Sequence, residues 1–185
     1  MRMLAATLGV AALLLASGSA ARPARASRIA PSAPSHCAAG ERVVYSCRFG
    51  AKLGSICLGR SSLHYRFGPA GHPAIDIAST PDWGNIHLGG NRSQGGLNQD
   101  TIRFTRGTTH YVVHQDETGS LNENPGRASS GIEVLQGLSG EQQLASLSCK
   151  AHSRFNWQAF GAISDAAPQG WDGAETPGGP FDMVY

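Results

Sequence analysis

Two histidines and an aspartate, His110, His114 and Asp116, are the residues whose types and spacing could do chemistry. Alternate side chains on a β-strand point to the same face, so all three would share one. Positions four apart on a strand lie about 13 Å apart, which is too far for one metal ion to bind both histidines. We therefore predict no metal site here, and we expect both histidines to be exposed positions of a sheet with one solvated face.

Other catalytic patterns are absent or incomplete. No G-x-S-x-G nucleophile motif occurs, and Asn91 stands where its first glycine would be before Ser93. Carboxylates that could pair for glycoside hydrolysis are spread along the chain at Asp82, Asp100 and Glu117. The sequence predicts no catalytic residues and no cofactor. An enzyme would depend on a hydrolytic site of Asp100, His114 and Asp116.

Two polar stretches have the composition of loops. Residues 89–96 are rich in glycine, but a phosphate-binding loop needs a following helix, and residues 101–105 have the pattern of a strand instead. Residues 116–131 form a long polar segment with turn residues at 124–126. Long loops are often functional, so 116–131 and the stretch 89–99 are the candidate binding loops.

Four cysteines follow an apolar N-terminal segment, at Cys37, Cys47, Cys57 and Cys149. The spacings are nine, nine and 91 intervening residues, unlike the C-x-x-C pairs of zinc sites. An even number of cysteines in an exported chain predicts two disulfides formed in an oxidising compartment. We therefore expect disulfides and no metal at these residues.

The N-terminus has the order of a secretory signal peptide: Arg2, an apolar run to Leu15, and small residues to Ala20. We predict a signal peptide at 1–20, a disordered leader at 21–36, and no stable membrane insertion after cleavage. The sequence has 15 lysines and arginines, and loss of Arg2 with the signal peptide leaves 14 against 13 acidic residues. This near-neutral, scattered charge argues against a nucleic-acid partner. The predicted location is periplasmic or secreted.

Residues 37–150 alternate apolar and polar side chains in short runs divided by glycine and proline, which predicts strands. No long apolar period of 3.6 residues interrupts them. The fold class is therefore all-β, a small antiparallel β-barrel or sandwich of about seven or eight strands. The expected strands are 43–49, 53–58, 63–67, 74–77, 83–88, 101–105, 109–115, 132–135 and 144–149.

The C-terminal extension, 151–185, has a different composition. A short helix is expected within 152–163, followed by an irregular acidic tail. Aromatic residues are unusually frequent for a disordered segment, and we favour their folding back onto the β-domain over a partner-binding tail. They are Phe155, Trp157, Phe160, Trp171 and Phe181.

The N-terminal half of the β-domain carries a motif of spaced cysteine, glycine, tyrosine and proline residues. They are Tyr45, Cys47, Lys52, Ser55, Cys57, Tyr65, Arg66, Phe67, Gly68, Gly71 and Pro73. This motif resembles an uncharacterised family of small secreted or periplasmic proteins of Gram-negative bacteria, which has the pattern C…GK..S.C, a tyrosine strand reading YRFG, and a G.P turn. The resemblance implies an exported β-domain and brings no activity with it.

A more distant likeness is to the small β-barrels that inhibit c-type lysozymes. Tyr45-Ser-Cys47 and Leu147-Ser-Cys149 are similar to their first and last cysteine strands, which would imply a disulfide from Cys47 to Cys149. The inhibitory loop of those proteins has no counterpart, because the nearest stretch, 93–98, lacks its tyrosine and spacing. The likeness therefore implies a fold and not an inhibitory activity.

Three disulfide pairings remain open from the residues alone. A hairpin centred on Lys52 would place Cys47 opposite Cys57. In the chain-entropy account that short loop is worth about 2.7 kcal/mol, against about 4.7 kcal/mol for a bond from Cys47 to Cys149. The longer link also joins the first strand to the last, so we favour it narrowly, with Cys37 bonded to Cys57.

A disulfide-braced scaffold with two polar loops and no assembled catalytic set favours a binding module. Its expected partner is an envelope or host protein, and its oligomeric state is undetermined by the sequence. The alternatives are a hydrolytic enzyme with a carboxylate and histidine site, or a structural component of the cell envelope.

Overall fold

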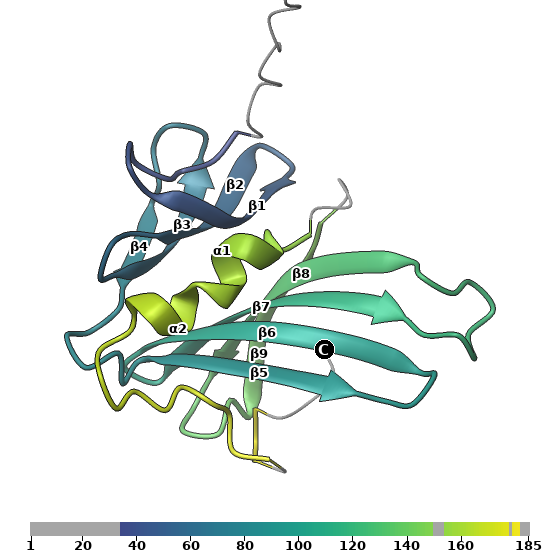
Figure 1. The fold of residues 1–185 in the computed structure, drawn as a ribbon. Helices are drawn as coiled ribbons and strands as arrows, with labels where there is room; N and C mark the ends of the chain where they lie inside the picture. Colours follow the sequence, from purple (N-terminus) through teal and green to yellow (C-terminus); the bar gives the residue numbers. More distant parts are fainter. Residues whose placement is uncertain (1–33, 150–153, 178, 182–185) are drawn as a thin grey trace, which may run out of the picture. The chain divides into compact units, whose positions relative to one another are not determined.

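The computed structural model describes residues 34–149, 154–177 and 179–181, and these residues form two antiparallel sheets (Figure 1). Each strand pairs with the next along the chain within its sheet. The four-stranded sheet contains β1 (Arg42–Phe49), β2 (Lys52–Leu58), β3 (Leu63–Pro69) and β4 (Ile75–Ala78). The five-stranded sheet contains β5 (Ile86–Arg92), β6 (Leu97–Arg106), β7 (Thr109–Thr118), β8 (Ala128–Gln136) and β9 (Gln142–Ser148).

The all-β prediction is confirmed, and the sandwich alternative describes the arrangement better than the barrel. Nine strands form in the described chain, one at each of the nine expected runs. No ladder between described strands joins one sheet to the other, so they do not close into a barrel.

Period-two alternation places the core between the two sheets. In the smaller sheet, Tyr45 pairs with Ile56, and Ile56 with Tyr65, so one buried row crosses three strands. In the larger sheet, Val113 lies between Ile102 and Ile132 in the same way. These rows belong to one hydrophobic cluster, which holds the sheets together.

The β1–β2 turn lies at Gly50 and Ala51, which corrects the expectation of a hairpin centred on Lys52. Gly50 has a φ of 63°, a conformation that glycine adopts without penalty. The register therefore sets Cys47 opposite Gly54, and the two hairpin cysteines do not face each other. The disulfides are Cys37–Cys57 and Cys47–Cys149, so the favoured pairing is confirmed.

The two predicted loops are shorter than expected, because strand pairing extends into them. Residues 89–92 belong to β5 and 97–99 to β6, where Gly90 pairs with Asp100, leaving a turn at 93–96. Likewise, β7 runs to Thr118 and β8 begins at Ala128, so the second loop is 119–127. Sequence composition suggests where a hairpin turns, but the ladder decides where its strands end.

Two short helices, α1 (Trp157–Gly161) and α2 (Ile163–Ala166), lie against the gap between the sheets on the side seen in Figure 1. The helix expected within 152–163 is shorter, because Asn156 caps α1 by accepting from the amide of Ala159. Phe155, Ala159 and Ile163 enter the main core. No helix of the described ranges is long and apolar enough to cross a membrane.

The chain then crosses to the outer face of the larger sheet. Ala174 forms a parallel bridge with Leu88, and the Trp171 indole donates to the carbonyl of Trp83. Phe181 is buried on Val112 and Leu135. The predicted folding back of the tail is confirmed for Phe155, Trp171 and Phe181.

The predicted signal peptide and residues 21–33 of the leader lie outside the described residues. The last leader residues do belong to the ordered domain. His36 is buried, its amide donates to Ser55 Oγ, and its ring bonds the carbonyls of Leu53 and Gly68. The ordered domain therefore already includes Pro34, which precedes the expected start at Cys37.

Candidate functional site

His110, His114 and Asp116 lie on the outer face of β7 as the alternation predicts, but the expected exposure of the histidines is wrong. Their exposed fractions are 5%, 8% and 6%. The Phe181 ring lies 4.5 Å from the ring centre of His110, and long polar side chains of β6 and β8 surround His114. Alternation identifies the face of a strand, but a distant segment decides whether that face meets solvent.

His114 lies between two carboxylates. Its Nδ1 is 3.1 Å from Asp116 Oδ2, and its Nε2 is 3.9 Å from Glu133 Oε1. Burial alone would raise the pKa of Asp116, but hydrogen bonds from His114, Gln99 and Ser129 lower it below its usual value. Glu133 accepts from Ser146 at 2.7 Å and from Gln143 at 2.6 Å. Each carboxylate is held by hydrogen bonds from neighbouring side chains, as in a buried structural network.

The three residues of the hydrolytic alternative do not come together. Asp100 pairs with Gln115 on the opposite face of the sheet from Asp116, and its carboxylate bonds Arg92. The other candidate carboxylates have separate partners as well: Asp82 accepts from Thr80 and the Gly84 amide, and Glu117 from Arg154. The structure of the described residues therefore does not bring the predicted hydrolytic residues together at one site.

A second polar cluster on this face was missed by the sequence reasoning. Arg103 of β6 is buried and holds Glu175 of the tail, with Nε–Oε1 at 2.5 Å and Nη2–Oε2 at 2.8 Å. The Phe181 ring centre lies 4.1 Å from the guanidinium carbon. Burial and the positive Arg103 lower the pKa of neighbouring His87 and His110. Glu175 is one of several acidic residues in the tail, and no local pattern marks it as the partner of Arg103.

The family-motif residues divide between the two faces of the smaller sheet. On its outer face, Arg66 binds Glu41 at 2.5 Å and Asp76 at 2.9 Å, and the hydrogen bond from Arg66 lowers the pKa of Glu41. Ser55 accepts from the His36 amide. Gly68 contacts the 71–73 turn so closely that a Cβ there would lie 2.4 Å from the Ala74 nitrogen. These residues therefore stabilise the sheet and its turn.

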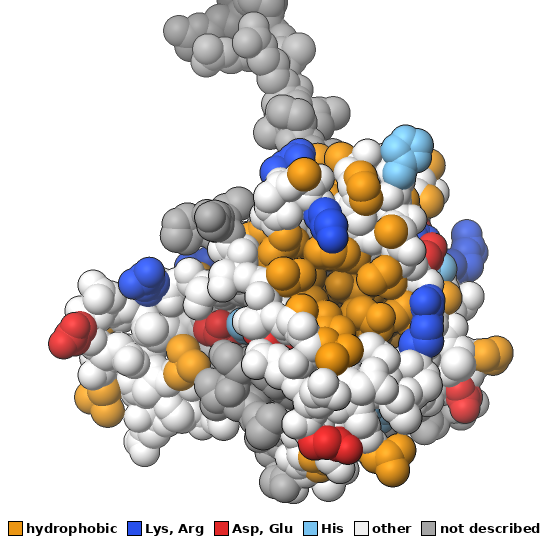
Figure 2. All heavy atoms as spheres, turned by 180° about the vertical axis from the view of Figure 1, so that it is seen from behind, with side chains coloured by type: hydrophobic (Ala, Val, Ile, Leu, Met, Phe, Trp, Pro, Cys, Tyr) orange, Lys and Arg blue, Asp and Glu red, His pale blue; other side chains and the backbone are white. Residues whose placement is uncertain are grey.

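On the inner face, the motif residues Lys52, Tyr65 and Phe67 line a groove between the two sheets. Figure 2 shows the apolar side chains gathered in a hollow on the side opposite to Figure 1. The groove has a volume of about 470 Å³. Its lining consists of Phe49, Ala51, Lys52, Tyr65, Phe67, Ile75, Tyr111, Val134, Ala145 and Leu147. We call it the inter-sheet groove.

The two shortened loops form one joined tip, defined by residues 93–96 and 119–127. The amide of Gly119 donates to the Gly96 carbonyl, and the amide of Leu121 donates to the Gly95 carbonyl at 2.8 Å. Asn122 Nδ2 donates to the same Gly96 oxygen at 2.8 Å. Leu121 is 81% exposed at this tip.

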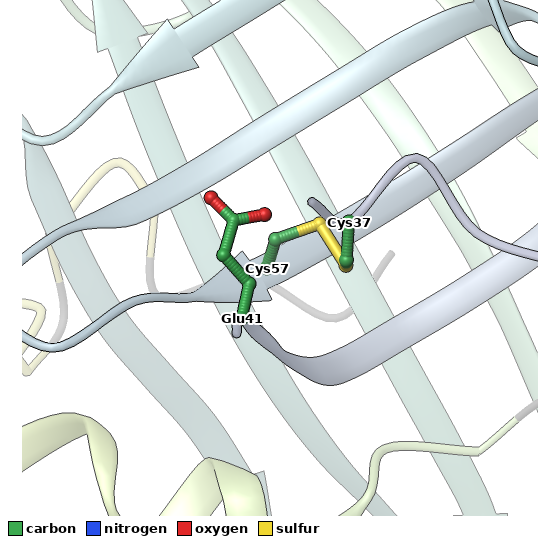
Figure 3. A group of neighbouring side chains, drawn as sticks. All are labelled: Cys37, Glu41 and Cys57. Atoms are coloured by element: carbon green, nitrogen blue, oxygen red, sulfur yellow. A yellow bond between two sulfur atoms is a disulfide. The ribbon is translucent and has the colours of Figure 1, made fainter. Parts of the chain in front are cut away.

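The one cluster of potential metal ligands among the described residues joins Cys37, Glu41 and Cys57 within 4.8 Å (Figure 3). Both sulfurs are bonded to each other in a disulfide, so neither is a thiolate ligand. The carboxylate of Glu41 already binds Arg66. The cluster is therefore a structural staple.

No family model, curated protein or solved structure matches this chain. The resemblance to the secreted family therefore stays a prediction. The described residues offer two surfaces of different chemistry, the polar joined tip and the apolar inter-sheet groove.

Proposed function

We propose that this chain is a periplasmic or secreted binding module that binds an envelope or host protein through the joined tip. The observation that carries the proposal is the bracing of loop 119–127 by the 93–96 turn. A loop held by hydrogen bonds loses less conformational entropy on binding than a free loop. Its exposed Leu121 would supply an apolar anchor among polar groups.

The position of the tip supports this proposal. It lies at the far ends of the β5–β6 and β7–β8 hairpins, beyond the sandwich core (Figure 1). The scaffold behind it is tied by the Cys47–Cys149 disulfide, which joins the two sheets. Two disulfides are typical of proteins that fold in an oxidising compartment.

Affinity capture from envelope and host extracts tests the proposal, with Leu121→Asp as the informative variant. Leu138→Asp is a matched control, because Leu138 is 85% exposed in the turn at the opposite end of β8. We expect to capture a protein whose affinity for the Leu121→Asp variant is lower by about tenfold or more. That loss is the effect of removing an interface anchor. Leu138→Asp should leave its affinity unchanged.

Replacing residues 119–126 by a two-residue turn should abolish the same interaction without unfolding the sheets. Equal capture by the wild type and both Leu121 and loop variants would contradict a partner at the tip. Co-fractionation with the envelope that survives the loop replacement would instead favour the structural alternative.

A further inference from the structure

The inter-sheet groove is an apolar surface that the described residues leave uncovered. Its walls come from both sheets, with Phe49, Phe67 and Ile75 on one side and Val134 and Leu147 on the other. The opposite opening of the sandwich is filled by Phe155 and the two helices. Concave apolar surfaces of this size, within the range of roughly 300–1,000 Å³, are typical of small-molecule sites.

The polar side chains of the groove can all donate hydrogen bonds, and none is negatively charged. Lys52 is the single charged residue of the lining, it is exposed, and its Nζ lies 5.6 Å from the Phe67 ring centre. The other polar side chains are Tyr65 and Tyr111, whose hydroxyls can both donate. The lining contains no carboxylate. Its charge therefore complements an anionic group and disfavours a cationic one.

Tyr65 and Tyr111 lie next to each other in the lining and come from different sheets. Tyr65 is 1% exposed, and its ring centre lies 5.3 Å from that of Tyr111. Burial raises the pKa of Tyr65, so its phenol stays protonated at neutral pH and can donate a hydrogen bond.

The lining favours a hydrocarbon chain over a peptide. Each peptide residue brings a backbone donor and an acceptor that must be satisfied when it is buried. Among the lining side chains, one ammonium and two phenol hydroxyls are available for this purpose, and the other side chains are hydrocarbon. An acyl chain makes no such demand, and its burial is favoured in proportion to the area removed from water.

We propose that the inter-sheet groove binds a free fatty acid, with its single hydrocarbon chain between the two sheets and its carboxylate beside Lys52. One chain suits a groove of about 470 Å³, where the two chains of a phospholipid would compete for the same space. The exposed ammonium marks the end where the groove meets solvent. The Tyr65 and Tyr111 hydroxyls provide further donors for the head group or for a bridging water.

Calorimetric titration of the purified protein with submicellar dodecanoate tests this proposal. We expect saturable binding of one dodecanoate per chain, and at least tenfold weaker binding of dodecyltrimethylammonium. Lys52→Gln should weaken dodecanoate binding about tenfold, as expected for loss of a charged hydrogen bond, and leave uncharged dodecanol unaffected. Lys52 is exposed, so this variant should fold normally.

Filling the groove provides a matched pair of variants on β9. Ala145→Trp places a large ring in the lining, whereas Leu144→Trp changes the adjacent residue, which is 52% exposed and not part of the groove. The first should abolish dodecanoate binding and the second should preserve it, with unfolding midpoints measured for both. Absence of dodecanoate binding, equal affinity for the cationic probe, or insensitivity to both Lys52→Gln and Ala145→Trp would overturn the proposal.

Discussion

The guanidinium of Arg103 holds the carboxylate of Glu175 through two hydrogen bonds, although 72 residues separate them in the chain. Both side chains are 8% exposed. This pair fastens the tail to the outer face of the larger sheet, next to the buried histidines. A charge that is removed from water is costly without its partner. The Arg103–Glu175 contact should therefore stabilise the packing of the tail on the sheet.

Glu175→Ala should loosen the tail, because it leaves Arg103 as a buried charge without its partner. We expect the free energy of unfolding to fall by about 3 kcal/mol, measured by urea denaturation, and proteolysis within 170–181 to become faster. The matched control is Glu117→Ala. Glu117 meets Arg154 at the surface, where side chains are 46% and 50% exposed, so its loss should cost about 1 kcal/mol or less. Equal costs for both variants would contradict the assigned role of Arg103.

The two disulfides should contribute unequally to stability. Cys47–Cys149 closes a separation of 102 residues and Cys37–Cys57 one of 20. Chain entropy predicts contributions of about 4.7 and about 3.3 kcal/mol respectively. Denaturation of the double serine variants, one bond removed at a time, should therefore show the greater loss without Cys47–Cys149. The reverse order would mean that native contacts around the shorter loop outweigh chain entropy.

Stability should decrease as the pH falls below about 6.5, the value of an unperturbed histidine. Burial and Arg103 lower the pKa of His87, and burial chiefly lowers that of His110, while Glu175 opposes both effects. The fold therefore favours neutral imidazoles, and the unfolded chain binds more protons below that pH. This histidine contribution should be fully lost once the pH has passed the folded-state pKa values of His87 and His110. His87→Gln should reduce the slope of unfolding free energy against pH, and an unchanged slope would exclude His87 as a cause.

The hydrogen bonds of the joined tip should depend on Gly119. A Cβ at this position would lie 2.6 Å from both the Gly95 carbonyl carbon and the Gly96 oxygen, so Gly119→Ala forces two backbones apart. We expect a cost of about 2 kcal/mol and faster amide hydrogen exchange at residues 119 and 121. Gly126→Ala, in the same loop, meets open space despite its φ of 73°. It should cost about 1 kcal/mol of backbone strain without opening the tip.

Local pattern predicted the strand content because side-chain alternation is a property of neighbouring residues. The rows through Tyr45 and Val113 follow from that period. The same reasoning placed His110 and His114 on one face correctly but predicted the wrong environment for that face. Covering it requires Phe181 and Glu175, which no periodicity connects to β7.

The candidate binding surfaces illustrate the same division. The motif drew attention to Lys52, Tyr65 and Phe67 as one group, and all three line the inter-sheet groove. Their partners Tyr111 and Val134 lie on the other sheet, so the groove exists only where the two sheets meet. The loop prediction located the tip but overestimated its length, because ladder hydrogen bonds continue into the glycine-rich stretch.

By itself, the sequence determined the all-β class, the presence of two disulfides and the aromatic character of the tail, since these depend on composition and short-range spacing. Tertiary structure alone decided the hairpin register, the burial of the β7 histidines, the Arg103–Glu175 pair and the inter-sheet groove. Each of these brings together residues distant in the chain. Their free energy comes from packing, desolvation and charge pairing between elements, and none of these terms is set by neighbours in sequence.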